Sequence, residues 1–124
     1  MYSITKQFAF EAAHHLNGLR EGHQCARQHG HSYRVEIVLA TERLNETGHT
    51  GFVRDYGDLD KFGQFLKDTY DHKDLNEIAP YNQGLQTSAE NIARVLFQWC
   101  YCEWPETVAV RVSETAKTWA EYRQ

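Results

Sequence analysis

Histidines gather in one short stretch of this sequence. Five of the seven lie between positions 14 and 31. His29 and His31 are two residues apart, so on a β-strand their imidazoles point to the same face of the sheet. His14 has the parity of the apolar side chains in an earlier alternating segment, and antiparallel pairing of the two segments places it beside the other two. We therefore expect the imidazoles of His14, His29 and His31 to converge on one side.

Three imidazoles with one open position are the ligand set of a catalytic zinc ion. Neutral imidazole is the commonest metal ligand, whereas structural zinc sites are usually closed by thiolates. The set lacks the carboxylate of an iron-binding facial triad, which favours zinc. Zinc would polarise hydroxyl or carbonyl oxygens of a substrate. The alternative is that these histidines only titrate near neutral pH, and we keep that interpretation for His15 and His23.

Cys25 lies four residues before His29 and is the candidate general base. A nearby metal or cation lowers the pKa of a thiol, and the thiolate can then take a proton. A solvent-exposed thiol without a role is the alternative. Cys100 and Cys102 lie in an apolar run and are expected to fill the core. Three cysteines are an odd and sparse set, so we expect reduced thiols rather than a disulfide framework.

Further polar residues could take part in chemistry. Asp71 and His72 form an acid–imidazole pair just past an expected helix, where they could relay protons or simply end the helix. Glu114 follows an expected strand, and its carboxylate could accept two N–H donors from a flat, guanidine-like heterocycle or be solvated. Glu90 already has a structural role in a capping box.

The remaining pattern predicts the elements that position these residues. Alternation predicts strands over 2–10, 33–39, 108–112 and 118–122, and apolar residues at steps of three and four predict helices over 57–70 and from Thr87 to just before Pro105. The second helix begins with the capping-box pattern from Thr87 to Glu90. The order β-β-α-α-β-β predicts one α+β domain over 1–124, a four-stranded antiparallel sheet with both helices on one face. Its other face and its edges stay exposed, and pairing of subunits into a closed barrel would cover them.

Composition narrows the class of partner. Lys and Arg total 13 against 17 for Asp and Glu, a net charge of −4, and no run of basic residues supplies a nucleic-acid footprint. The sequence has neither a run of about 18 apolar residues nor an apolar signal core near its start. We expect a cytoplasmic protein with no nucleic-acid or membrane partner.

Six motifs occur in order from one end of the chain to the other. They are Phe10-Glu11-Ala12-Ala13-His14, Cys25-x3-His29-Gly30-His31, residues 53–59, residues 71–76, Ala89-Glu90-Asn91 and Ser113-Glu114-Thr115. In these motifs the chain resembles the 6-pyruvoyl-tetrahydropterin synthase family, and it looks most like the bacterial branch, the 6-carboxy-5,6,7,8-tetrahydropterin synthases of queuosine biosynthesis. The pattern His-Gly-His alone is weak, whereas six ordered motifs are specific.

The resemblance implies a fold, an assembly and a set of roles. The fold would be the tunnelling fold, or T-fold, with trimeric barrels stacked in pairs as a homohexamer. Zinc would bind the three histidines at 14, 29 and 31. Cys25 would be the general base, coupled to Asp71 and His72 as a relay. Substrate would be held by Glu114 at the pterin ring, with Ser88 and Glu90 as lesser contacts and Arg27 as the basic residue nearest the cluster.

The resemblance also implies a reaction. In the bacterial branch a zinc-dependent lyase converts 7,8-dihydroneopterin triphosphate to 6-carboxy-5,6,7,8-tetrahydropterin, acetaldehyde and triphosphate. The alternative within the family is a 6-pyruvoyl-tetrahydropterin synthase, which eliminates triphosphate. The alternative of another class is a non-catalytic zinc-binding module. This chain departs from the family's frequent pattern at His15 and Thr87.

Overall fold

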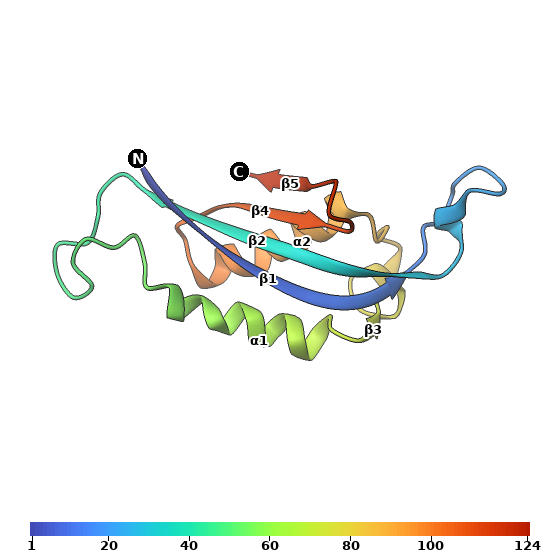
Figure 1. Ribbon diagram of the computed structural model, residues 1–124, viewed down its shortest axis with the longest axis horizontal. Helices are drawn as coiled ribbons and strands as arrows, with labels where there is room; N and C mark the ends of the chain where they lie inside the picture. Colours follow the sequence, from blue (N-terminus) through green and yellow to red (C-terminus); the bar gives the residue numbers. More distant parts are fainter.

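Two long strands form the centre of the molecule. The computed structural model describes residues 1–124, and in it β1 (Tyr2–His14) and β2 (His29–Thr41) pair antiparallel along their whole length, from Tyr2 opposite Thr41 to His14 opposite His29. Figure 1 shows them running the length of the molecule, with a loop beyond each end of the pair. Both strands extend further than the predicted 2–10 and 33–39, and the extensions carry the histidines.

The sheet has five strands in the order β3-β1-β2-β4-β5. β4 (Thr107–Ser113) pairs antiparallel with β2, and β5 (Ala120–Arg123) pairs antiparallel with β4. β3 (Lys73–Asp74) pairs parallel with β1, so the prediction of four antiparallel strands is wrong and the sheet is mixed. A strand of two residues shows no alternation, and the sequence pattern could not reveal it.

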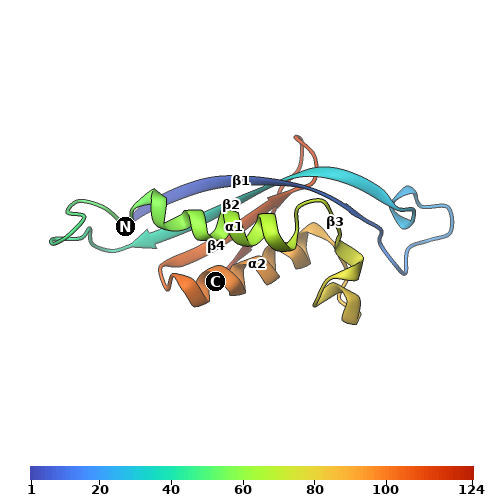
Figure 2. The same ribbon diagram turned by 90° about the horizontal axis from the view of Figure 1, so that it is seen from below.

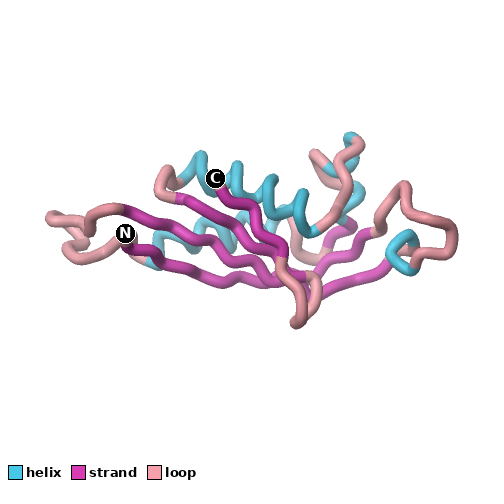
Figure 3. The backbone as a smooth tube through the Cα atoms, turned by 90° about the horizontal axis from the view of Figure 1, so that it is seen from above, coloured by secondary structure: helices cyan, strands magenta, loops and turns pink.

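Both helices cover one face of the sheet, as predicted (Figures 2 and 3). They are α1 (Asp60–Thr69), which follows a 3-10 turn at Tyr56–Leu59, and α2 (Ala89–Glu103). Shorter 3-10 turns lie at Gln24–Ala26, Leu75–Glu77 and Tyr81–Gln83. The core fills the space between sheet and helices, and Tyr33, Val35 and Ile37 from β2 are fully buried in it. Alternation along β2 therefore directs its odd-numbered side chains, the histidines included, toward the helix side.

The start of α2 corrects one prediction. Ser88 is the N-cap, and its hydroxyl accepts a hydrogen bond from the Asn91 N–H at 3.3 Å. The capping box predicted at Thr87 is therefore wrong by one residue. Either of two adjacent hydroxyl residues is a suitable N-cap by type. Here the side chain of Thr87 is fully buried, with its hydroxyl bonded to the His15 carbonyl just after the end of β1.

The two cysteines of α2 differ in burial. Cys100 is buried in the core as predicted, but Cys102 is exposed, so the prediction that both fill the core is wrong. Residues two apart on a helix point to different sides, which explains the difference. None of the helices is both long and apolar enough to cross a membrane.

Candidate functional site

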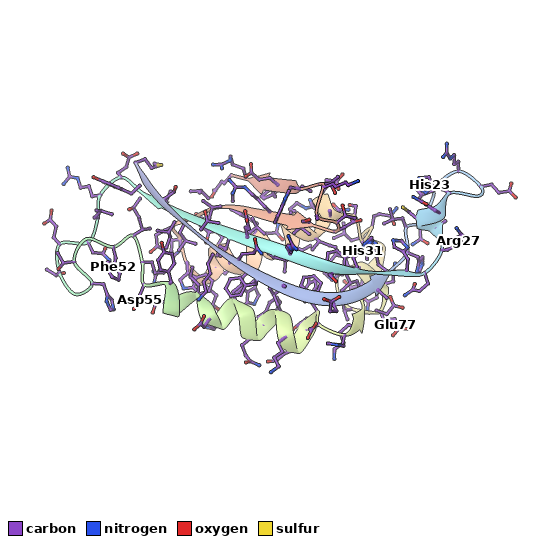
Figure 4. The ribbon with its side chains drawn as sticks, in the orientation of Figure 1. His23, Arg27, His31, Phe52, Asp55 and Glu77 are labelled. Carbon is purple, nitrogen blue, oxygen red and sulfur yellow. The ribbon has the colours of Figure 1, made fainter.

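The structure brings together the three histidines singled out from the sequence. His14 and His29 are cross-strand partners, and His31 lies two residues further along β2. Their ring centroids are 4.6 to 5.1 Å apart, and one nitrogen from each lies within 4.8 Å of the other two. Figure 4 places His31 on β2, near the end that leads to the loop of His23 and Arg27. The three rings form a group that could hold a metal ion.

Hydrogen bonds at Nδ1 set the direction of two of these rings. The Nδ1 atom of His14 lies 2.9 Å from the Thr87 carbonyl oxygen, and that of His29 lies 2.6 Å from the Arg27 carbonyl oxygen. A carbonyl oxygen can only accept, so each Nδ1 carries the proton and each Nε2 presents a lone pair. Nε2 of His14 and Nε2 of His31 are buried without a hydrogen-bond partner. A buried, unpaired nitrogen with a lone pair, as at Nε2 of His14, fits a metal ion that takes imidazole nitrogens.

Burial favours the neutral form of two imidazoles of the triad, those of His14 and His31. The pKa of His14 is lowered to about 4, mainly by loss of solvation on burial. The hydrogen bond to the Thr87 carbonyl raises this pKa in part, and positive charge on His29 and His31 lowers it further. Burial also lowers the pKa of His31, with a further contribution from His29. A neutral imidazole is the form that binds a metal, so near neutral pH no proton has to leave these two rings first.

Glu114 lies beside the triad, one residue after β4. One of its carboxylate oxygens is 3.4 Å from Nε2 of His31. Burial raises the pKa of Glu114, and the charge of Glu90 raises it further against the opposing effects of His29 and the Ala89 N–H. The two carboxylates and Trp119 line one cavity of about 370 Å³. The cavity therefore combines acceptors for N–H groups with an aromatic face.

Trp119 belongs to the site by position and was missed in the sequence. Its side chain is 43% exposed at this cavity, in the segment between β4 and β5. The sequence pattern assigned it to a strand, whereas β5 begins at Ala120. An aromatic residue a few positions after Ser113-Glu114-Thr115 is the signal that could have revealed it.

Cys25 opens onto a second cavity that also reaches the triad. It lies in the 3-10 turn Gln24–Ala26, and its backbone carbonyl accepts a hydrogen bond from the Leu16 N–H at 2.8 Å. The cavity, about 480 Å³, is lined by Gln24, Cys25, Arg27, Gln28, His29 and His31. A half-buried thiol, a guanidinium and two triad imidazoles thus face one space.

Asp71 and His72 form a pair that is tied to the edge of β1. Nδ1 of His72 is 2.9 Å from the Asp71 carboxylate. Asp71 accepts a hydrogen bond from the Glu11 N–H at 2.8 Å, and the His72 N–H donates to the Glu11 carbonyl at 2.6 Å. The hydrogen bond from the Glu11 N–H, with a smaller contribution from His72, holds the pKa of the Asp71 carboxyl below its usual value. His72 has a φ of 58°, in the left-handed region, so these contacts hold a strained backbone.

The pair does not share a cavity with Cys25. His72 lines a third space, of about 490 Å³, together with His31 and Lys73, and its side chain is 78% exposed. Of the other predicted site residues, Ser88 is engaged as the α2 cap. His15, which the parity argument set aside, lies with its Nδ1 3.0 Å from the Gln28 side chain.

The fold defines the class of protein. A solved structure of Caenorhabditis elegans 6-pyruvoyl tetrahydropterin synthase superposes with a TM-score of 0.82 at 24% identity, over 99% of this chain and 95% of that one. The five-stranded mixed sheet with two helices on one face is therefore the α+β T-fold of these synthases.

The sequence comparisons give the family itself. The family model described as 6-pyruvoyl tetrahydropterin synthase matches residues 3–124, and the chain belongs to this family of tetrahydropterin-forming lyases. A 6-carboxy-5,6,7,8-tetrahydropterin synthase of Synechocystis is 40% identical over 100 residues, which cover 78% of this chain and 73% of the relative. An enzyme of the same name from Haemophilus influenzae is 27% identical over the whole of both chains.

Proposed function

We propose that this protein is a zinc-dependent 6-carboxy-5,6,7,8-tetrahydropterin synthase of queuosine biosynthesis. It would convert 7,8-dihydroneopterin triphosphate and one water to 6-carboxy-5,6,7,8-tetrahydropterin, acetaldehyde and triphosphate, and would work as a homohexamer. The observation that carries the proposal is the convergence of the imidazoles of His14, His29 and His31 beside the Glu114 cavity. The product is chosen from the names of the Synechocystis and Haemophilus relatives.

The Glu114 cavity would bind the pterin ring. The 2-amino group and the adjacent ring N–H of a pterin present two donors in one plane, which a carboxylate can accept together. Glu90 lies close enough to raise the pKa of Glu114 and adds a second acceptor in the same cavity. The exposed face of Trp119 would stack on the flat heterocycle.

The three histidines would hold zinc, and Cys25 would move the proton. Bound zinc supplies Lewis acidity that polarises hydroxyl and carbonyl oxygens of the side chain of the substrate. Cys25 faces the same cavity as His29 and His31, where its thiolate can take a proton from the carbon next to such an oxygen. Arg27 lines this cavity too and supplies positive charge for the triphosphate.

Asp71 and His72 would act as the proton relay from a neighbouring subunit. Cys25 and His72 open onto different cavities of one chain. No cavity of one chain is lined by both side chains, so we place the relay between two copies, which the proposed hexamer would bring together. The unpaired outer edge of β1 carries the pair, because β3 covers this edge only at Ala12 and Ala13.

One experiment separates the candidate functions. The purified protein is analysed for metal and then incubated with 7,8-dihydroneopterin triphosphate, and the products are identified. Bound zinc with acetaldehyde and the carboxy product supports the proposal. Zinc with the pyruvoyl product indicates the other synthase, and zinc without turnover indicates a binding module. Turnover that is unchanged after the metal has been removed would contradict zinc dependence.

A further inference from the structure

Thr87 is buried against the triad and has no role in capping α2. It precedes the N-cap Ser88, and its side chain is fully buried. Nδ1 of His14 lies 2.9 Å from the carbonyl oxygen of Thr87 and 3.2 Å from its hydroxyl oxygen. The Thr87 hydroxyl makes a side-chain hydrogen bond to a ring of the triad, whereas His29 is bonded to a backbone carbonyl. The Glu114 carboxylate lies 3.4 Å from Nε2 of His31 without forming a hydrogen bond. Residues 73 positions apart are thus joined at the end of β1.

The protons around Nδ1 of His14 can be assigned from these contacts. The Thr87 hydroxyl donates its proton to the His15 carbonyl at 3.0 Å. Because that proton is engaged, the hydroxyl can only accept toward His14, as the Thr87 carbonyl must. Two acceptors face Nδ1, so Nδ1 carries the proton. Nε2, buried and unpaired, therefore keeps its lone pair on the side of His29 and His31.

We propose that Thr87 is a positioning residue that fixes the tautomer and the ring orientation of His14 for metal binding. The inference rests on the metal site of the proposed function. Hydrogen bonds to the far nitrogen of a ligating histidine orient its ring and raise its affinity for the metal. The hydroxyl also holds the His15 carbonyl, which follows His14 directly, so it anchors both the ring and its backbone.

A valine at position 87 tests the hydroxyl while keeping the branched shape. The Thr87 carbonyl still accepts from Nδ1 of His14 in Thr87→Val, so we expect this variant to weaken zinc binding by about tenfold, the lower end for loss of such a contact. Competition with a chromophoric chelator measures this, and Thr87→Ser should remain near the wild-type value. The matched control is Thr107→Val. Thr107 is equally buried, and its hydroxyl donates to the Trp104 carbonyl at 2.8 Å, but it lies at the other end of β2 from the triad. This variant should lose stability and keep its zinc affinity.

The outcomes distinguish the inference from the function on which it rests. If Thr87→Val binds zinc as tightly as the wild type does, Thr87 has no positioning role although the metal site stands. If the wild type itself binds no zinc, the proposed metal site fails. A second measurement needs no variant and therefore stays valid if Thr87→Val fails to fold. Nitrogen NMR of the metal-free wild type should show the proton of His14 on Nδ1. A proton on Nε2 would overturn the inference.

Discussion

His14 and His29 face each other at the last pair of the β1–β2 ladder, with ring centroids 4.6 Å apart. The position of this pair is a consequence of strand register. A shift of one residue would turn every side chain of one strand to the other face. The buried apolar residues that precede His14 on β1 and follow His31 on β2 prevent that shift, so the same packing that builds the core also holds the imidazoles together.

Replacing His29 with alanine should remove zinc binding. The variant leaves two imidazoles, one fewer than a catalytic zinc site normally has, and it should lose the metal at concentrations that saturate the wild type. Metal analysis after dialysis measures this, with circular dichroism as the test of folding. His15→Ala is the matched control, because His15 lies beside His14 in sequence but its ring bonds Gln28. Full zinc retention in the His29 variant would contradict the assigned ligand set.

Replacing Cys25 with alanine should separate metal binding from turnover. Cys25 faces the cavity of the triad but is not part of the proposed ligand set. We expect zinc content at the wild-type level and a turnover reduced by at least about a hundredfold, the lower range for loss of a general base. The exposed Cys102 provides a control, since Cys102→Ala should change neither quantity. Unchanged turnover in the Cys25 variant would remove the thiol from its proposed role.

Mixing two inactive variants tests whether the relay comes from another subunit. Cys25→Ala and His72→Ala should each be inactive alone. Because the two side chains open onto different cavities of one chain, equal mixing with subunit exchange should restore about a quarter of the sites, those with both groups intact. Mixing the Cys25 variant with the double variant supplies no intact thiol and should stay inactive. A first mixture no more active than its parents would place both groups within one chain or remove one from catalysis.

Trp119 should contribute to substrate binding and not to metal binding. Removing an aromatic platform beneath a flat heterocycle costs about 1–3 kcal/mol. We expect Trp119→Ala to raise KM at least about fivefold, with zinc content unchanged, and Trp119→Phe to restore most of the loss. The exposed Tyr101 on α2 lines none of the cavities, and Tyr101→Ala is the control. Equal KM values in the wild type and the alanine variant would exclude stacking at this position.

The features that could be predicted from the sequence are those that depend on the periodicity of apolar residues. Alternation located the four longer strands, and steps of three and four located both helices, because each pattern reflects one face packed on a core. The same parity argument brought His14 to His29 and His31 and left His15 aside. The convergence of the three histidines could be predicted because it follows from the pairing register of two strands.

Features set by single tertiary contacts could not be predicted in this way. β3 is too short for a pattern and forms because residues near His72 meet the edge of β1 at Glu11. The capping-box pattern favoured Thr87, whereas in the fold Thr87 is hydrogen-bonded to His14 and the hydroxyl of Ser88 caps α2. His72 likewise lies outside the Cys25 cavity because of the path that the chain takes after α1. The spacing of residues in the sequence does not predict this path.

Two buried tyrosines should make the protein less stable in alkaline solution. The hydroxyl groups of Tyr70 and Tyr81 are hydrogen-bonded to each other at 2.8 Å in the core. Burial raises the pKa of Tyr70 to about 12 and raises the pKa of Tyr81 as well, while an unfolded chain ionises its tyrosines near pH 10. The folded state therefore binds more protons above that pH, so the stability is complete below pH ~10 and falls as the pH rises toward the folded pKa values.

The expected slope is about 1.4 kcal/mol per pH unit above pH 10 for each buried hydroxyl. Urea unfolding at a series of pH values measures the slope, and tyrosinate absorbance shows that the two groups stay protonated while the protein is folded. The double variant Tyr70→Phe with Tyr81→Phe removes both hydroxyls without leaving one unpaired, and its slope should be smaller by the contribution of two protons. An equal slope in the two proteins would show that these hydroxyls ionise as readily in the fold as outside it.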